Sequence, residues 1–342
     1  MSSARPAPRA DEAWFDPSGG SLVVAGDNLE AAARLPDGAF TLVYLDPPFN
    51  TGRIQRREHF VGTRRAEDPL DDAEHPPAPD AAPSPGSGTE PSGVGRGIRA
   101  GFRGTSYDSV RTELARYHDR FEDFWGFLFP RLEEAWRLLA EDGTLYLHLD
   151  YREAHYAKVA MDALVGRERF LNEIVWAYDY GARPKRRWPA KHDTILVYVK
   201  NPGRYHFDSA EVEREPYMAP GLVTAEKAAR GKLPTDVWWH TIVSPTGKEK
   251  TGYPTQKPLG ILRRIIAASS RPGDWVLDLF GGSGTTGAAA SELGRRFVCV
   301  DEHPDAVAVM RRRLPGAGYV NLGWAEDELG DDGATRAGPR TA

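Results

Sequence analysis

The sequence predicts an α/β protein with a mostly parallel β-sheet and helices on both faces. Two observations support this prediction. Short apolar runs alternate with amphipathic stretches along most of the chain, which is the pattern of repeated βα units. Two loops of unusual composition, 46–52 and 278–287, each follow directly on such a run. Because parallel sheets bind ligands at the carboxyl ends of their strands, we expect both loops to contribute to one site.

The strands are predicted from short apolar runs that end in turn residues. Pro47 and Pro48 end the second run, since proline cannot donate to a β-ladder. Asp142 and Gly143 form a turn before a later run. The seven predicted strands are 21–25, 40–45, 144–149, 174–178, 194–199, 275–279 and 296–300.

Stretches with helical periodicity lie between these runs. The longest covers 110–139, and we expect an interruption at Pro130 because proline lacks the N–H group that a helix needs. Residues 201–250 show no strong periodicity. The predicted helices are 28–35, 110–139, 153–164, 259–269 and 285–293.

The length of 342 residues suits one α/β domain that carries insertions. Segment 64–101 is rich in proline, glycine, serine, alanine and acidic residues, with too few large apolar residues to offset the entropy of ordering. We predict that it is a disordered insert. A disordered N-terminus at 1–12 and a disordered tail at 326–342 leave one domain at 13–325.

The net charge of −5 excludes a uniformly basic nucleic-acid-binding surface, so any DNA contact requires a local positive patch. One such patch lies in the loop 183–191. Its cations could contact phosphates, although a charge run is also typical of a plain solvated surface. The candidate DNA-binding residues are Arg183, Lys185, Arg186, Arg187 and Lys191.

The cellular compartment is predicted from what the sequence lacks. Cys299 is the single cysteine, so no disulfide can form within the chain, which favours a reducing compartment. No apolar run reaches membrane-spanning length, and the N-terminus lacks the apolar stretch of a secretory signal. We therefore expect a cytoplasmic protein.

The first motif is a glycine loop between a strand and a helix. Gly282, Gly284 and Gly287 have the GxGxxG spacing, which permits a tight turn and close approach of a ligand. Asp301 ends the next strand and could accept hydrogen bonds from ribose hydroxyls. Asp278 would repel a pyrophosphate but suit a cationic amino group, which favours S-adenosylmethionine over a dinucleotide. An ordinary glycine-rich turn is the alternative.

The second motif is Asp46-Pro47-Pro48-Phe49. An exocyclic base amine is a poor nucleophile because its lone pair is delocalised into the ring. The Asp46 carboxylate and a carbonyl of the rigid proline pair could accept its two N–H groups and localise that lone pair. Phe49 could stack on the base, which must leave the duplex. Alone, the motif could also be a turn that ends a strand.

Four further side chains are candidates for contact with a base or a metal ion. Trp238 and Trp239 could stack on bases, but paired tryptophans more often pack in a core. His148 and His192 lie within or beside predicted strands, and no neighbour has metal-ligand spacing. We interpret both histidines as structural and expect no metal.

With both motifs in place, the chain resembles the amino-methyltransferases of DNA, specifically the permuted beta class. In that family the Asp-Pro-Pro-Phe/Tyr motif comes first, a target-recognition region follows, and the glycine motif lies near the C-terminus. This chain has the same order over most of its length outside the insert and tails, with 201–250 as the candidate target-recognition region. The resemblance implies a Rossmann-like S-adenosylmethionine-dependent methyltransferase fold, with a seven-stranded sheet and circularly permuted motifs.

The resemblance also implies roles for individual residues. Asp27 would lie near the adenine of the cofactor, while Thr255 and Lys257 would hold its methionine end. Catalysis would fall to the motif from Asp46 to Phe49. The implied cofactor-binding residues are Asp27, Thr255, Lys257, Asp278, Phe280, Gly282, Ser283, Gly284, Thr285 and Asp301.

The expected function is transfer of a methyl group from S-adenosylmethionine to N6 of adenine in double-stranded DNA, at a short recognition sequence and with base flipping. The run 49–52, Phe-Asn-Thr-Gly, is similar to the adenine-modifying members. Cytosine N4, RNA and a protein amide remain alternative acceptors. A DNA-binding module without catalysis and a dinucleotide oxidoreductase are more distant alternatives. A homodimer and a separate restriction endonuclease are left open as partners.

Overall fold

The computed structural model describes the larger part of the chain in two compact units. One unit comprises residues up to Arg53 together with those from Asp119 onward, and the other comprises Ile54–His118. The predicted disordered ends, 1–12 and 326–342, lie outside the described residues. The described residues are 14–49, 53–64, 95–100, 106–119, 123–181, 183–244 and 246–323.

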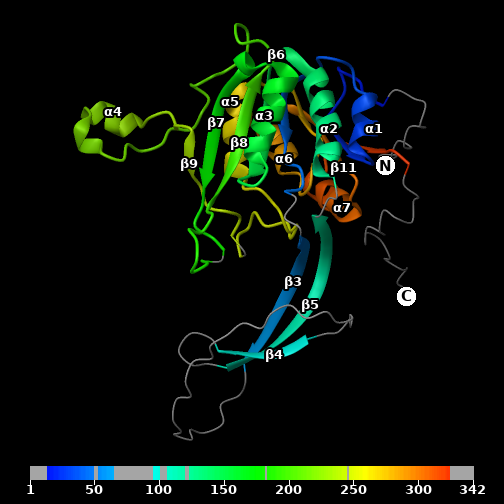
Figure 1. The fold of residues 1–342 in the computed structure, drawn as a ribbon, viewed down its shortest axis with the longest axis vertical. Coiled ribbons are helices and arrows are strands. Elements are labelled where there is room, and N and C mark those ends of the chain that lie inside the picture. Colours follow the sequence, from blue (N-terminus) through cyan, green and yellow to red (C-terminus); the bar gives the residue numbers. More distant parts are fainter. Residues whose placement is uncertain are drawn as a thin grey trace, which may run out of the picture. The chain divides into compact units, whose positions relative to one another are not determined.

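The larger unit is built on one nine-stranded sheet in the order β12-β1-β11-β10-β2-β6-β8-β7-β9 (Figure 1). Six of its eight strand pairings are parallel, and β8 alone runs antiparallel to both of its neighbours. The strands are β1 (Leu22–Ala25), β2 (Phe40–Leu45), β6 (Leu139–Asp150), β7 (Phe170–Ala177), β8 (His192–Val199), β9 (Val237–Trp239), β10 (Trp275–Asp278), β11 (Arg296–Asp301) and β12 (Gly318–Asn321).

The prediction of a mostly parallel sheet is confirmed, but its seven strands become nine. The two additional strands, β9 and β12, have three and four residues and form the two edges of the sheet. Strands this short carry no periodicity of their own, because pairing with a neighbour defines them. Trp238 of β9 is buried and donates its indole N–H to the Thr235 carbonyl at 2.7 Å, whereas Trp239 is 75% exposed.

Helices cover both faces of this sheet, as predicted. The buried residues of β2 alternate between the two layers: Val43 and Leu45 pack in one hydrophobic cluster, Leu42 and Tyr44 in the other. One cluster contains α1 (Asn28–Ala33), α2 (Phe124–Leu138) and α3 (Ala154–Val165), and the other contains α5 (Leu259–Ser269), α6 (Thr285–Glu292) and α7 (Pro304–Arg313).

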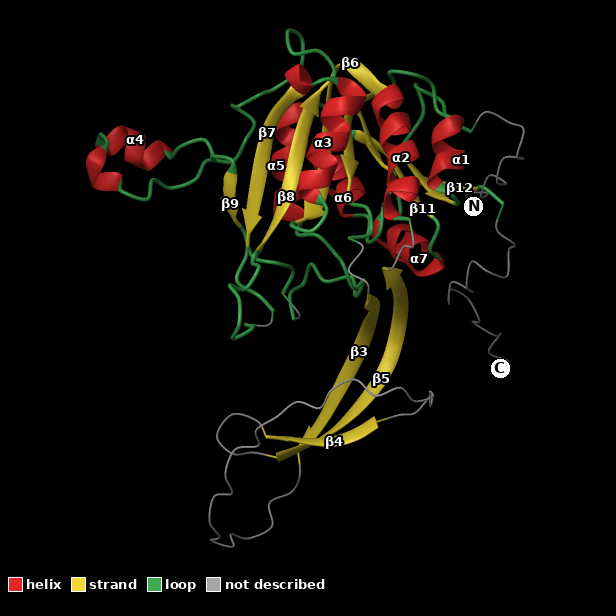
Figure 2. Cartoon of the chain, viewed as in Figure 1, coloured by secondary structure: helices red, strands yellow, loops and turns green. Residues whose placement is uncertain are grey.

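The smaller unit is a three-stranded sheet in the order β3-β5-β4 (Figure 2). It comprises β3 (Arg53–Arg64), β4 (Gly95–Ala100) and β5 (Ser106–Asp119), with β4 and β5 antiparallel. Residues 110–119 are therefore strand, and the predicted helix over 110–139 is wrong in that part. Residues 106–111 of β5 pair with β4, and β3 lies on the other side of β5, so strand pairing in this sheet overrides the helix preference of Glu-Leu-Ala-Arg at 113–116. Of the predicted insert 64–101, residues 65–94 lie outside the described residues, while 95–100 form β4.

The candidate recognition region 201–250 contains β9 and the short helix α4 (Ala225–Arg230), which has no buried residue. A backbone bridge between Glu215 and Lys232 closes the base of the segment that carries α4. Figure 1 shows α4 beyond the β9 edge of the sheet. Within the described part of the chain, no helix has the length and apolar character needed to span a bilayer.

Helix α2 contains Pro130 without a break, so the predicted interruption there is wrong. The helix begins after Asp123, whose carboxylate accepts the N–H of Gly126 at 2.8 Å. Proline cannot supply the N–H that would bond to the preceding turn. The packing of Leu128 and Leu132 against the sheet thus keeps α2 continuous despite the lost hydrogen bond.

Pro130→Ala is expected to raise the free energy of unfolding by about 1–3 kcal/mol, because alanine restores the missing backbone donor. Denaturant titration measures the change. Glu133→Ala, on an exposed position of the same helix, serves as the control and should lie within about 0.5 kcal/mol of the parent. A destabilised Pro130→Ala would instead mean that the packing of α2 requires the proline.

Candidate active site

Sheet topology brings both sequence motifs to the carboxyl ends of the strands in the larger unit, which we call the carboxyl edge of the sheet. Strands β2 and β10 are neighbours, with Asp278 paired to Tyr44, so Asp46 and the glycine loop leave the sheet side by side. On the other side of β10, β11 ends at Asp301, and Ala25 of β1 pairs with Asp301 just before Asp27. Four motif carboxylates therefore lie at the carboxyl ends of four adjacent strands.

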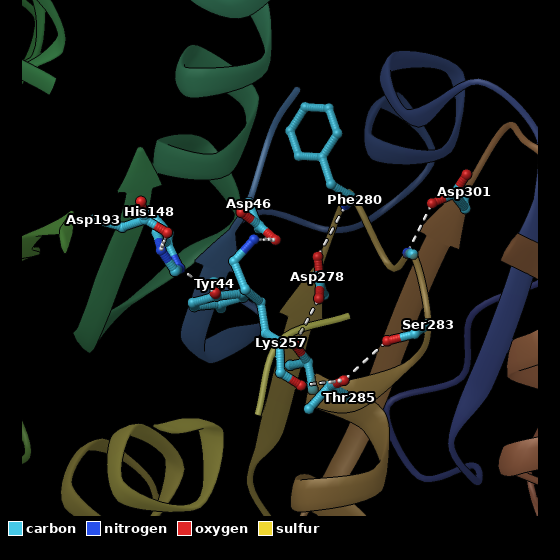
Figure 3. A network of polar contacts seen from close by, with 12 residues as sticks. Tyr44, Asp46, His148, Asp193, Lys257, Asp278, Phe280, Ser283, Thr285 and Asp301 are labelled. Atoms are coloured by element: carbon cyan, nitrogen blue, oxygen red, sulfur yellow. Dashed lines mark hydrogen bonds and ion pairs between the residues drawn. The ribbon is translucent and has the colours of Figure 1, made fainter. Parts of the chain in front are cut away.

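The Asp46 carboxylate has one paired and one unpaired oxygen. Its Oδ2 accepts a hydrogen bond from Lys257 Nζ at 2.5 Å (Figure 3). Its Oδ1 is buried and has no hydrogen-bond partner within the described residues. The two side chains are only 15% and 11% exposed. Because a buried polar atom is normally hydrogen-bonded, Oδ1 is an acceptor available to an incoming N–H group.

The aromatic residue of the motif lies against the same ion pair. Lys257 Nζ is 4.7 Å from the centroid of the Phe49 ring, a cation–π distance. On its other side, Phe49 is 5.8 Å from the His148 ring. Pro47 is buried and Pro48 partly buried, so the prolines anchor the backbone between the carboxylate and the ring.

A network of hydrogen bonds between buried polar side chains lies next to this motif. His148 Nδ1 lies 2.7 Å from the Tyr44 hydroxyl, and its Nε2 lies 3.3 Å from Asp193 Oδ2. The Tyr178 hydroxyl donates to the other Asp193 oxygen at 3.0 Å. This network joins β2, β6 and β8 to the residue that follows β7, in keeping with the structural role predicted for His148.

Asp278 closes the glycine loop on itself. Its carboxylate is 2% exposed and accepts the Phe280 N–H at 2.9 Å and the Thr286 hydroxyl at 2.6 Å. Burial raises the pKa of Asp278 to about 7, although both hydrogen bonds act in the opposite direction. The nearby carboxylates of Asp46 and Asp301 raise this pKa further. The loop is thus built around a carboxylate that forms no ion pair with any of the described residues.

Two glycines of this loop, Gly281 and Gly284, allow α7 to pack closely against it, a role that their spacing in the sequence did not predict. A Cβ on Gly281 would lie 2.7 Å from Met310 Sδ, and one on Gly284 would lie 2.9 Å from Met310 Cγ. Gly284 also has a φ of +71°, which disfavours any side chain. Gly282 likewise has a positive φ, of +50°, and a Cβ there would lie 3.4 Å from Tyr253 Cε1, an ordinary contact distance.

Asp301 and Asp27 bind backbone donors at the same edge. Asp301 accepts the N–H groups of Gly282 and His303, each at 2.8 Å. Burial raises its pKa to about 6, against these hydrogen bonds. Asp27 caps α1 by accepting the N–H groups of Leu29 and Glu30, each at 2.9 Å. Both aspartates hold local backbone in place before any ligand is considered.

The remaining implied cofactor residues differ in burial and in the groups they contact. Ser283 and Thr285 are buried, and the Thr285 hydroxyl donates to the Lys257 carbonyl at 3.1 Å. Phe280 is partly buried, with its ring 6.0 Å from that of Phe127. Thr255 lies exposed on the surface. The side chain of Lys257 contacts Asp46, and only its backbone carbonyl contacts the glycine loop.

Sequence reasoning missed several residues of this site. Arg313 of α7 donates to the Ser283 carbonyl at 3.1 Å and to the Thr285 hydroxyl at 3.0 Å. Asn28 donates to the Leu279 carbonyl at 2.9 Å and so ties α1 to the glycine loop. The polar His148 within an otherwise apolar strand was a usable signal for the network below the motif. No local pattern pointed to Arg313 or Asn28.

Two of the predicted DNA-binding cations bind groups within their own loop, and three are exposed to solvent. Arg183 pairs with Asp179 at 2.9 Å, and Lys191 donates to the carbonyls of Tyr180 and Gly181, so these two close the neck of the loop. The other three, Lys185, Arg186 and Arg187, are exposed. The loop follows β7, which runs parallel to β6 and β2, and it therefore leaves the same sheet edge as Asp46.

Comparison with known proteins identifies the family. A family model described as DNA methylase matches residues 40–312. The chain is 43% identical over 206 residues to the Type II methyltransferase M2.DpnII of Streptococcus pneumoniae, covering 59% of this chain and 71% of that protein. It is 32% identical over 206 residues to the DNA adenine methyltransferase YhdJ of Escherichia coli (strain K12), covering 58% and 69%.

Two further matches bear on extent and fold. The Type II methyltransferase M.HpaI of Haemophilus parainfluenzae is 31% identical over 196 residues, and the match spans 57% of this chain and 60% of that protein. Among solved structures, the PvuII DNA methyltransferase (cytosine-N4-specific) superposes with a TM-score of 0.53 at 15% identity, covering 90% of each chain. That likeness shows the fold.

The raised pKa values predict how stability depends on pH. Folded Asp278 keeps its proton up to about pH 7, whereas the unfolded chain releases it near 3.8. The folded state thus binds more protons in this interval, so the free energy of unfolding should fall as pH rises through it. Asp278→Asn should reduce that fall up to about pH 7, and Asp301→Asn only up to about pH 6.

Denaturant unfolding at closely spaced pH values measures both variants against the parent. A fall of the same size in all three proteins would contradict the assignment of this pH dependence to the two carboxylates.

Proposed function

The chain belongs to the DNA methylase family, and from this premise we propose that it transfers a methyl group from S-adenosylmethionine to N6 of adenine in duplex DNA. One observation carries the proposal. The Asp46 carboxylate presents a buried, unpaired Oδ1 beside a glycine loop that follows the adjacent strand. An acceptor oxygen of this kind suits the N–H group of an exocyclic amine.

The chemistry follows from the amine. Asp46 Oδ1 would accept one N–H and a carbonyl of the Pro47-Pro48 segment the other, which localises the nitrogen lone pair. When bound, S-adenosylmethionine would supply a sulfonium methyl group. The amine nitrogen would bond to the methyl carbon as the carbon–sulfur bond breaks and its electron pair stays on sulfur, and the extra proton on nitrogen would then pass to water. Phe49 would position the base by stacking on its face.

Lys257 has a distinct place in this scheme. Its ammonium offsets the charge of Asp46 through Oδ2 and leaves Oδ1 for the substrate. Its carbonyl accepts the Thr285 hydroxyl, so the catalytic carboxylate is mechanically linked to the glycine loop. We propose that Lys257 orients Asp46, in addition to or in place of the cofactor contact that the family resemblance implies.

The residues of the glycine edge fit a nucleoside cofactor with a cationic amino acid part. Asp301 ends β11 beside the glycine loop and could accept hydrogen bonds from ribose hydroxyls. Asp278 is buried and Asp301 partly buried, and among the described residues neither forms an ion pair with a lysine or arginine, so a bound cation would relieve their repulsion. We propose that these two, with Phe280, Ser283, Gly284, Thr285 and Asp27, form the cofactor site.

Two aspects of the substrate are also proposed. Adenine is supported by the name of the Escherichia coli relative, a DNA adenine methyltransferase, and by Phe49-Asn50 in the motif. The relatives named Type II methyltransferases support a role in a restriction–modification system with a separate endonuclease. In that case, DNA methylated by this protein should resist an endonuclease of the same sequence specificity.

Incubation of the protein with unmethylated genomic DNA and S-adenosylmethionine tests the function. Single-molecule sequencing should map N6-methyladenine to one short motif. Asp46→Asn should lower the methylation rate at least about 100-fold, because it removes an acceptor aimed at the reacting amine. Asp142→Asn, a surface carboxylate paired with Arg271, should leave the rate unchanged.

Nucleoside mass spectrometry of the same DNA identifies the base. N4-methylcytosine would overturn the adenine assignment but keep the mechanism. Methylation of RNA in preference to DNA, or undiminished activity of Asp46→Asn, would overturn the proposal itself.

Lys257→Met should separate the two roles that Lys257 could have. If the ammonium orients Asp46, kcat should fall about tenfold or more while the Kd for S-adenosylmethionine stays within about threefold. Steady-state kinetics and calorimetric titration of the cofactor measure the two quantities, with Arg271→Met, in an exposed ion pair with Asp142, as the control. A weakened Kd with unchanged kcat would assign Lys257 to the cofactor instead.

A further inference from the structure

We propose that Trp188 enters the DNA duplex and fills the space left by the target base when that base is turned out toward Asp46. This inference rests on the proposed function and assigns a role to a residue outside both motifs. An extruded base leaves its neighbours unstacked, which costs stacking free energy. A large flat side chain that stacks on those neighbours would recover part of that cost.

The loop that carries Trp188 leaves the carboxyl end of β7 (Figure 1). Because β7 runs parallel to β6 and β2, this is the end of the sheet at which Asp46 lies, with β6 and β8 between β2 and β7. At its neck, Tyr178 bonds to Asp193, which lies beside His148, and the His148 ring lies 5.8 Å from Phe49. A continuous set of contacts therefore joins the neck of the loop to the catalytic motif.

Hydrogen bonds hold the neck of the loop. The Tyr178 N–H donates to the Lys191 carbonyl at 2.9 Å, and Lys191 Nζ donates back to the carbonyls of Tyr180 and Gly181 at 2.5 and 3.0 Å. Arg183 pairs with Asp179. Two prolines, at 184 and 189, further restrict the backbone on either side of the tip. A side chain presented by such a loop loses little entropy on binding.

The surroundings of Trp188 favour nucleic acid as its partner. The indole is 94% exposed, and a single exposed aromatic residue is by itself unremarkable on a protein surface. Here, however, Lys185, Arg186 and Arg187 precede it directly and are exposed, in a chain of net charge −5. These cations can contact phosphates while the indole stacks between bases.

A second exposed tryptophan at this edge provides the comparison. Trp239 ends β9, next to Ala177 of β7, and is 75% exposed. Its neighbours in sequence, Trp238 and His240, supply no cluster of lysine or arginine. A residue that stacks on any exposed base would be replaceable by Trp239, whereas a residue guided by phosphate contacts would not.

The experiment uses duplexes that carry the motif most strongly methylated by the parent protein in genomic DNA. In one duplex the target adenine is paired with thymine, and in the other it lies opposite an abasic site, so that extrusion is already easy. Trp188→Ala should methylate the paired target about tenfold more slowly than the parent. On the abasic duplex its rate should equal that of the parent within about twofold.

Trp188→Phe should recover most of the rate on the paired duplex, and Trp239→Ala should be slowed on neither. Arg187→Gln gives a further contrast, since it should lower the slope of log Kd against log salt by about one phosphate contact. Trp188→Ala should leave this slope unchanged, because it removes no charge. Cofactor affinity and thermal stability confirm that each variant is folded.

Equal slowing of Trp188→Ala on both duplexes, no slowing on the paired duplex, or a selective loss in Trp239→Ala would each overturn the inference. Failure of the proposed function looks different. In that case the parent protein itself would methylate neither duplex, and the role of Trp188 would fall with it.

Discussion

The ion pair between Asp46 and Lys257 is the contact on which the rest of the site depends. It joins residues 211 positions apart, one at the end of β2 and the other just before α5. A mostly buried carboxylate without a partner is costly, so this pair is what allows Asp46 to stand at the sheet edge with one oxygen unpaired. The Lys257 carbonyl, bonded to Thr285, extends the same connection to the glycine loop.

Near this pair, the carboxyl ends of the strands bring the carboxylates of Asp46, Asp278 and Asp301 close together. Their burial and mutual repulsion oppose folding. Burial raises the pKa of both Asp278 and Asp301, and the neighbouring carboxylates add to the effect for Asp278. Perturbed carboxylates at the ends of adjacent parallel strands are typical of a ligand site. A cationic ligand would remove the electrostatic penalty, so binding and stability are coupled at this edge.

The scaffold below the edge explains how these charges stay in place. The chain from Tyr44 through His148 and Asp193 to Tyr178 satisfies the buried polar groups of four neighbouring segments. It also fixes the neck of the basic loop relative to Phe49. Chemistry at the motif and contact with DNA would therefore share one rigid support, which reduces the motion lost when a substrate binds.

The seven central strands, the position of both motifs and the family could be predicted from the amino-acid sequence alone, because turn chemistry and apolar periodicity are encoded over a few residues. The sequence did not determine the edge strands β9 and β12 or the strand at 110–119, which exist through pairing with distant neighbours. The sequence also did not reveal that Lys257 binds Asp46, or that Met310 leaves no space for a side chain at positions 281 and 284. Only the tertiary structure decides such contacts, since they depend on which segments the fold brings together.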